Sequence, residues 1–180
     1  MYGLINKTIE ELVTEKYGAE KWSIVMEHSK TDPDAFITNS YYPDEVTLGL
    51  VSSASQVLKI SANDLLFAFG EYWILKTGME KYGAILSANG TTLADFLINL
   101  PGFHSRVMLI YPEITPPDFF IEKIGEKEFI IHYHSQRDGL TEFMRGLISG
   151  MGKMFKIDVN IVLESPKTSN GDHDIFRVKW

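Results

Sequence analysis

The sequence predicts an α+β fold in which a helical N-terminal part packs on a four-stranded antiparallel sheet with one inserted helix. Apolar residues recur at helical spacing through the first two thirds of the chain, and they alternate after Pro116-Pro117. One further helical stretch interrupts the alternating segments. The length of 180 residues suits a single domain over 1–180, with a helical part over about 1–115 and a helix-and-sheet part over about 116–180.

Short amphipathic helices open the chain. Helical spacing of apolar residues predicts one helix up to Tyr17-Gly18 and another that ends near His28. A third helix begins at Pro43-Asp44-Glu45, because acidic residues favour the first turn of a helix. Ser61 to Asp64 starts the next helix. The following segment, LLFAFGEYWILKT, is apolar on most sides, so we expect this helix to be buried.

Two more helices follow the turn at Asn89-Gly90. The segment TLADFLINLPGFHSRVMLIYP predicts one helix, an interruption at Pro101-Gly102, and a second helix that carries His104. The alternating segment DFFIEKIGEKEFIIHYHSQR then predicts a β-hairpin with its turn near Gly125. The stretch GLTEFMRGLISGMGKMF is the inserted helix. A second hairpin, DVNIVLES and DIFRVKW, is joined through the polar segment from Pro166 to Asp172.

Composition and net charge restrict the classes of function that this chain can have. Apolar residues make up 44% of the chain and aromatic residues 12%, which supplies large rings for lining a cavity. The net charge of −7 disfavours nucleic-acid and membrane partners. The chain has no cysteine, which excludes disulfides and thiolate metal ligands. Acidic residues near the start exclude a signal peptide, so we expect a cytoplasmic location.

His104 is the first candidate site residue. On a helix it shares a face with Leu100, Val107, Met108 and Tyr111, where core residues belong. It is either a core histidine with hydrogen-bonded ring nitrogens or a metal ligand. A single imidazole satisfies an axial haem site, because the porphyrin supplies the other nitrogen ligands.

The end of the first hairpin is the second candidate site. Alternation places Tyr133, Ser135 and, if the strand persists, Arg137 on one face, with His132, His134 and Gln136 on the other. Two hydroxyls and a guanidinium together suit the binding of carboxylates. The alternative is a solvated strand end with a surface arginine.

The pattern Tyr133-x-Ser135-x-Arg137, the helical His104 before it and Pro116-Pro117 between them resemble the signature of the H-NOX family, the haem nitric oxide/oxygen binding domains. The opening MYGLINK, AFGEYW at 68–73 and DHDIF at 172–176 are also similar to bacterial stand-alone members, so the resemblance covers essentially the whole chain. It implies haem b between the two parts of the fold.

The resemblance also implies residue roles. His104 would be the proximal iron ligand, while Tyr133, Ser135 and Arg137 would bind the haem propionates. Pro117 would press on the porphyrin and distort it, besides ending its segment. Further contacts fall to neighbours of these residues: Leu100 and Phe103 would touch the haem, and Asp44 would orient Arg137.

Gas preference depends on the distal wall. In oxygen-binding relatives a tyrosine on the helix after the Tyr-x-Ser-x-Arg strand holds dioxygen, but Gly139–Phe155 contains no tyrosine and offers Phe143 instead. The resemblance therefore implies nitric oxide and carbon monoxide as ligands, without stable oxygen binding. Trp73 is the one nearby donor that leaves an oxygen sensor open as the alternative within the family. The expected distal residues are Met1, Leu4, Ile5, Trp73, Thr77, Met144 and Leu147.

Signalling follows from the resemblance as well. Nitric oxide would weaken the bond between iron and His104, and release of His104 would let the helical part shift relative to the sheet. We expect no enzyme activity, because the residues form no nucleophile, base and oxyanion arrangement. We expect output in trans, through a histidine kinase or a diguanylate cyclase/phosphodiesterase.

Two hypotheses from other functional classes remain. His132 and His134, with Asp172-His173-Asp174 nearby, are compatible with a non-haem metal site. The chain is also compatible with an acidic protein-interaction domain that carries no cofactor. A visible absorption spectrum separates them, because only histidine-ligated haem gives an intense Soret band.

Overall fold

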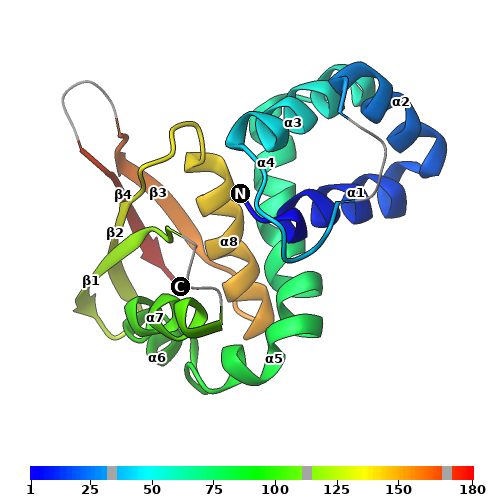
Figure 1. Ribbon diagram of the computed structural model, residues 1–180. Coiled ribbons are helices and arrows are strands. Elements are labelled where there is room, and N and C mark those ends of the chain that lie inside the picture. Colours follow the sequence, from blue (N-terminus) through cyan, green and yellow to red (C-terminus); the bar gives the residue numbers. More distant parts are fainter. Residues whose placement is uncertain (32–35, 111–114, 168–171) are drawn as a thin grey trace.

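The computed structural model describes residues 1–31, 36–110, 115–167 and 172–180. Helices α1 (Gly3–Tyr17), α2 (Ala19–Ser29) and α3 (Asp44–Leu58) form a lobe on one side (Figure 1). A four-stranded antiparallel sheet lies on the other side, and α8 (Thr141–Met154) packs between the sheet and α4 (Ala62–Tyr72). The predicted α+β class is confirmed.

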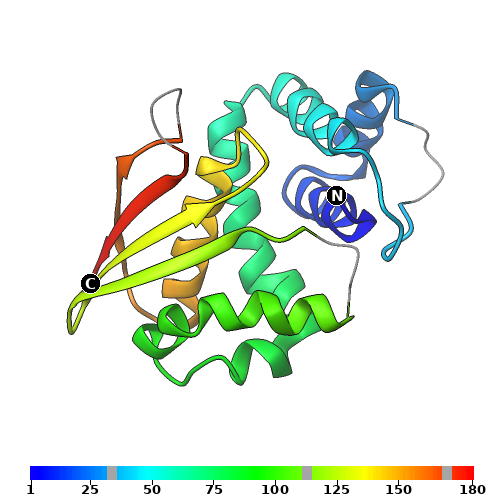
Figure 2. The ribbon, with the colours of Figure 1, turned by 60° about the vertical axis from the view of Figure 1, so that its left-hand side comes forward.

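Helix α4 runs on through η1 (Trp73–Gly78), a π-helical turn, into α5 (Met79–Ser87). The sequence pattern did not predict this π-helical turn. The chain then forms α6 (Leu93–Ile98) and α7 (Leu100–Ile110), which lie below the sheet in Figure 2. The predicted interruption at Pro101-Gly102 is wrong in position. The helices separate at Asn99, and Pro101 lies in the first turn of α7, where its missing N–H breaks no helical hydrogen bond.

The sheet contains β1 (Asp118–Gly125), β2 (Glu128–His134), β3 (Asn160–Ser165) and β4 (Asp174–Lys179), in the order β1-β2-β4-β3. Both predicted hairpins form, with the first turn after Gly125. Side chains of β2 alternate, so that Ile131 and Tyr133 face the core while His132 and His134 occupy the outer face. β2 ends at His134, and Arg137 therefore belongs to the following loop.

Two hydrophobic cores hold the molecule together. One lies between α1, α2, α3 and α4, with Leu12 and Leu50 at its centre. The other joins the sheet with α6, α7 and α8 around Phe96 and Phe176. The division between cores therefore does not follow the expected boundary near residue 115, because α6 and α7 pack with the sheet. Trp73 packs against both cores.

The backbones of α4 and α8 are in direct contact. A Cβ on Gly146 would lie 2.1 Å from the carbonyl oxygen of Phe67, and a Cβ on Gly70 would lie 2.2 Å from that of Phe143. The two glycines therefore allow the helices to approach more closely than side chains would permit. None of the described helices is both long enough and apolar enough to cross a bilayer. Tyr111, and residues 168–171 of the predicted Pro166–Asp172 connection, lie outside the described residues.

Candidate functional site

A cavity of about 400 Å³ is lined by residues from both cores, a volume in the range of small-molecule and cofactor sites. Its wall is mostly apolar and comes from the start of α1, η1, α7, the end of β2 and α8. Nearly all the site residues predicted from sequence lie in this wall: Met1, Leu4, Ile5, Trp73, Leu100, Phe103, His104, Pro117, Tyr133, Ser135, Arg137, Met144 and Leu147.

Thr77 is the exception. Its side chain is fully buried, and its hydroxyl lies 3.2 Å from the hydroxyl of Thr8 on α1. It does not line the cavity. An α-helical continuation would place Thr77 one turn beyond Trp73 on the same face, but a π-helical turn hydrogen-bonds from i to i+5, so a residue four positions on leaves that face.

His104 lies in the cavity wall on α7, held by two aromatic rings. Its imidazole stacks on Phe119 of β1, with centroids 5.2 Å apart, and meets Phe103 edge-on at 5.5 Å. Its Nδ1 atom is buried and makes no hydrogen bond with any described residue that meets the usual geometric limits. This environment is compatible with a metal ligand, whose second ring nitrogen would face the Leu100 carbonyl.

Burial lowers the pKa of His104 to about 4. The Asp118 carboxylate and the Leu100 carbonyl oppose this shift without overcoming it. The imidazole is therefore neutral at physiological pH, and a neutral ring nitrogen keeps the lone pair that a metal ion needs.

The predicted carboxylate-binding group gathers at the cavity rim. Tyr133 and Ser135 both line the cavity, and burial raises the pKa of the Tyr133 hydroxyl, which stays protonated as a donor. Arg137 also reaches the wall, although it lies beyond the end of β2. Its Nε donates to Asp44 at 2.8 Å and its Nη1 to the Thr115 carbonyl at 3.1 Å.

Asp44 occupies the position expected for a residue that orients Arg137. It accepts a hydrogen bond from Arg137 and, at 2.7 Å, another from the Met1 amine. Burial would raise the pKa of Asp44, but the hydrogen bond from Met1 and the attraction to Arg137 outweigh burial and lower it. The carboxylate thus stays ionised and fixes the guanidinium at the rim.

The side of the cavity formed by η1 and α8 offers few hydrogen-bond donors. The α8 residues in the wall are Phe143, Met144, Leu147 and Met151, all apolar. Trp73 differs from them. Its Nε1 is buried and has no hydrogen-bond partner among the described residues, and its ring stacks on Tyr82 with centroids 6.4 Å apart.

Sequence reasoning missed part of the wall. Tyr2, Tyr41 and Tyr82 line the cavity, as do Ile74 and Thr38. No periodic pattern in the sequence identifies these residues as part of the cavity wall. Tyr2 and Tyr41 pair through an isolated β-bridge. Tyr82 lies in α5, after η1, and its own backbone angles are non-helical.

The remaining histidines lie elsewhere. His132, His134 and His173 are on the outer face of the sheet and do not line the cavity, while His28 is exposed on α2. Asp174 is buried and binds the Thr141 hydroxyl, so it serves the packing of α8 on β4.

The geometry defines the chemistry that the cavity suits. An apolar chamber with one neutral imidazole in its wall and a guanidinium with two hydroxyls at its rim fits a flat, largely apolar molecule. That molecule would bear carboxylates at one edge and a metal that needs an axial nitrogen ligand. The residues present therefore fit a haem.

Comparison with known proteins points the same way. A family model described as haem-NO-binding matches residues 2–163. Soluble guanylate cyclase gcy-34 of Caenorhabditis elegans is 28% identical over 192 aligned residues, covering 99% of this chain and 28% of the cyclase. The chain thus spans about a quarter of the length of the curated relatives that it matches.

Solved structures share the fold. The Fe(II) unliganded H-NOX protein from K. algicida superposes with a TM-score of 0.85 at 22% identity, covering 99% of this chain and 96% of that chain. An H-NOX protein from S. oneidensis in the Fe(II)NO state gives a TM-score of 0.88 at 18% identity, with 99% and 98% coverage. At these identities the structures establish the fold alone. Because the family model covers residues 2–163, the chain belongs to the haem-NO-binding (H-NOX) family of haem-based gas sensors.

Proposed function

We propose that this chain binds haem b through the imidazole of His104 and senses nitric oxide. The observation that carries the proposal is a buried, neutral imidazole in the wall of an apolar cavity, with a buried Nδ1 that lacks a partner. When bound, haem supplies an iron that takes a diatomic gas opposite its axial histidine. We expect the Nδ1–H to turn towards the Leu100 carbonyl, because metal-bound histidines donate their second N–H to such a group.

The rim residues orient the cofactor. Tyr133 and Ser135 supply hydroxyl donors, and Arg137 supplies a guanidinium that can hold a carboxylate with two hydrogen bonds. Asp44 and the Thr115 carbonyl already fix two edges of that guanidinium, so little side-chain entropy remains to be lost when a propionate binds. Pro117, Leu100 and Phe103 line the same cavity as His104, and we propose that they contact the porphyrin ring.

Gas preference follows from the donors available. Bound dioxygen carries partial negative charge and needs a hydrogen-bond donor, whereas nitric oxide and carbon monoxide bind ferrous iron without one. The proposal rests on α8, because in oxygen-binding relatives the helix after the Tyr-x-Ser-x-Arg strand carries the tyrosine that holds dioxygen. Here the α8 residues Phe143, Met144 and Leu147 offer no donor, and the hydroxyls of Tyr2, Tyr41 and Tyr82 in the wall come from other segments. We therefore propose nitric oxide and carbon monoxide as the ligands, without stable oxygen binding.

The signal would leave through α7. His104 stacks on Phe119 of β1, so movement of the imidazole changes the contact between α7 and the sheet. Arg137 and Asp44 join the loop after β2 to the start of α3, and therefore connect the sheet half to the helical lobe. We propose that this rearrangement regulates a signalling protein, with a histidine kinase or a diguanylate cyclase/phosphodiesterase as the expected types.

The test is spectroscopic. Haem-supplied wild-type protein should show an intense Soret band and bind nitric oxide in the ferrous state. His104→Gly should lose the histidine-ligated spectrum and regain it when imidazole is added to the space left by the side chain. His28→Ala, which alters an exposed histidine on α2, is the matched control and should behave as wild type. Colourless wild-type protein, or a His104→Gly spectrum and partner regulation that match wild type, would refute the proposal.

An oxygen sensor is the second candidate, favoured by Trp73. Its indole N–H is buried in the cavity wall without a partner, and a donor left unpaired costs roughly 1–3 kcal/mol unless a ligand satisfies it. A bound dioxygen would supply that acceptor. A persistent oxy spectrum in air would favour this candidate over the first.

A further inference from the structure

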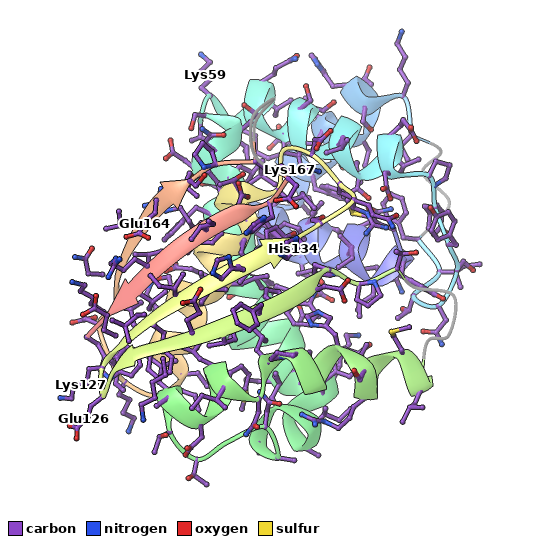
Figure 3. The ribbon with its side chains drawn as sticks, turned by 90° about the vertical axis from the view of Figure 1, so that its left-hand side faces the viewer. Lys59, Glu126, Lys127, His134, Glu164 and Lys167 are labelled. Atoms are coloured by element: carbon purple, nitrogen blue, oxygen red, sulfur yellow. The ribbon has the colours of Figure 1, made fainter. Side chains whose placement is uncertain are left out.

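Three histidines gather on the outer face of the sheet, away from the cavity. His132 and His134 lie on β2, and His173 lies directly before β4. The rings of His134 and His173 stack with centroids 3.9 Å apart, and those of His132 and His173 are 5.1 Å apart. Figure 3 looks onto this face and shows His134 at the end of its strand.

Hydrogen bonds connect the cluster to a carboxylate at each end. His132 Nε2 lies 2.6 Å from Glu122 Oε1, and His132 Nδ1 lies 2.9 Å from His173 Nε2. His173 Nδ1 contacts the carboxylate of Asp172. The chain of contacts therefore runs from Glu122 through two imidazoles to Asp172.

The protons in this chain do not balance when both rings are neutral. If each ring donates its one N–H to its own carboxylate, the two inner nitrogens face each other as acceptors at 2.9 Å. If His173 instead donates from Nε2 to His132, and His132 donates from Nε2 to Glu122, the two contacts made by His132 each have one donor. His173 Nδ1 then presents a lone pair beside the Asp172 carboxylate. Either a proton or a metal ion at Nδ1 removes the repulsion between this lone pair and the carboxylate, and in the metal-bound form Nδ1 and Asp172 become neighbouring ligands.

His134 adds a third potential metal ligand to His173 and Asp172. His134, Asp172 and His173 each offer one ligand atom, and the three atoms lie within 4.8 Å of one another. Two imidazoles and a carboxylate are the donor set of zinc-class ions, with bonds of about 2.0–2.2 Å. All three side chains are at least partly exposed, so small rotations can bring them to that distance.

We propose that His134, Asp172 and His173 bind a divalent transition-metal ion of the zinc class, at a second site distinct from the cavity. His132 and Glu122 hold His173 in the required tautomer, in the way that second ligand-shell carboxylates fix metal-bound histidines. The nearby amine of Lys167 does not oppose the ion strongly, because it is paired with Asp138 at 2.7 Å and donates to the Ser135 carbonyl.

The position of the site gives it a structural consequence. An ion there joins the end of β2 to the start of β4. His134 lies between Tyr133 and Ser135, which face the cavity from the other side of the chain. The proposal does not depend on haem binding, because none of its residues lines the cavity.

Isothermal titration of Zn²⁺ into tag-free, metal-stripped full-length protein tests the site. Wild type should bind one equivalent. His173→Ala should weaken binding by more than about 100-fold, because loss of a ligand exceeds the roughly 10- to 100-fold effect of losing a group that orients one. His132→Ala should fall within that smaller range. Circular dichroism of each variant shows whether the fold persists.

Two controls separate the outcomes. His28→Ala removes an exposed histidine elsewhere and should leave the affinity unchanged. His104→Gly should also leave it unchanged, even if haem binding is lost, so that this proposal and the proposed function can fail independently. No binding heat in wild type, or equal Zn²⁺ affinity in wild type and folded His173→Ala, would overturn the site.

Discussion

At the scale of the residue, the histidines show that surroundings decide chemistry. His104 is enclosed by Phe103 and Phe119 in an apolar wall, and burial keeps it neutral. His132 and His173 lie on the sheet surface in a row of contacts between two carboxylates. The same side chain therefore suits an axial cofactor ligand in one place and a surface metal site in another.

The lowered pKa of His104 predicts the acid stability of cofactor ligation. A depressed pKa means that the neutral, metal-binding form persists as the pH falls from 6.5 to about 4. Acid titration of haem-loaded protein, followed by the Soret band, should therefore show the histidine-ligated spectrum intact at pH 5, with loss near or below about 4. A midpoint close to 6.5 would contradict this prediction.

The indole N–H of Trp73 can be tested for a role in oxygen binding. Trp73→Phe keeps a large ring against Tyr82 and removes only the unpartnered N–H. We expect the nitric oxide and carbon monoxide spectra of this variant to match wild type, since neither ligand needs the donor. We also expect no persistent oxy spectrum in either protein under air. If wild type gives a persistent oxy spectrum and Trp73→Phe does not, the chain is an oxygen sensor and not a nitric oxide sensor.

The sequence predicted some site residues and missed others for one physical reason. Alternation relates Tyr133 on β2 to Ser135 directly after it, helical spacing singled out His104, and the H-NOX resemblance added the role of His104 as an iron ligand. Tyr41 and Tyr82 reach the cavity from segments whose position depends on how distant elements pack. No period in the local sequence encodes that packing, so these residues appeared only in the structure.

At the scale of the element, periodicity predicted the types of helix and strand because each element buries one face. It failed where a local rule is ambiguous. The segment from Leu65 to Thr77 is apolar on most sides, and such a segment does not distinguish an α-helical continuation from the π-helical turn of η1. Pro101 suggests an interruption of the helix, although a proline is equally suited to a first helical turn.

The contact between α4 and α8 predicts opposite effects for two glycine substitutions. Gly146→Ala would place a Cβ 2.1 Å from the Phe67 carbonyl oxygen, which is backbone and cannot turn aside. We expect it to lower the free energy of unfolding by about 1–3 kcal/mol or more, as overpacking does. Urea unfolding measures this change.

Gly49→Ala is the matched control. Gly49 is inside α3, and a Cβ there meets nothing within 4 Å. Alanine is favoured over glycine in a helix interior, so we expect a gain of about 0.5–1 kcal/mol. If Gly146→Ala were as stable as Gly49→Ala, the close approach of α4 and α8 would not exist in solution.

At the scale of the whole molecule, the cavity lies where two separately packed cores meet. The halves are connected by the α4–α8 contact, by Trp73 and by the ion pair between Asp44 and Arg137. This ion pair is partly exposed, so its own contribution to stability is modest, about 0–1 kcal/mol. Its importance is positional, because it connects the guanidinium that we propose to bind the cofactor to both halves of the molecule.

That arrangement predicts a movement between the halves when the gas binds. The chain has no cysteine, so Lys21→Cys on α2 and Lys127→Cys at the turn between β1 and β2 give two unique spin-labelling sites. Both residues are exposed, and Figure 3 shows Lys127 at the tip of the hairpin. Adding nitric oxide to the ferrous protein should shift the label-to-label distance, by an amount on the order of 2 Å. The same pair in a His104→Gly background should show no shift, because the proposed link from gas to α7 is cut. Identical distances with and without nitric oxide in the wild-type background would mean that the signal leaves without relative motion of the lobe and the sheet.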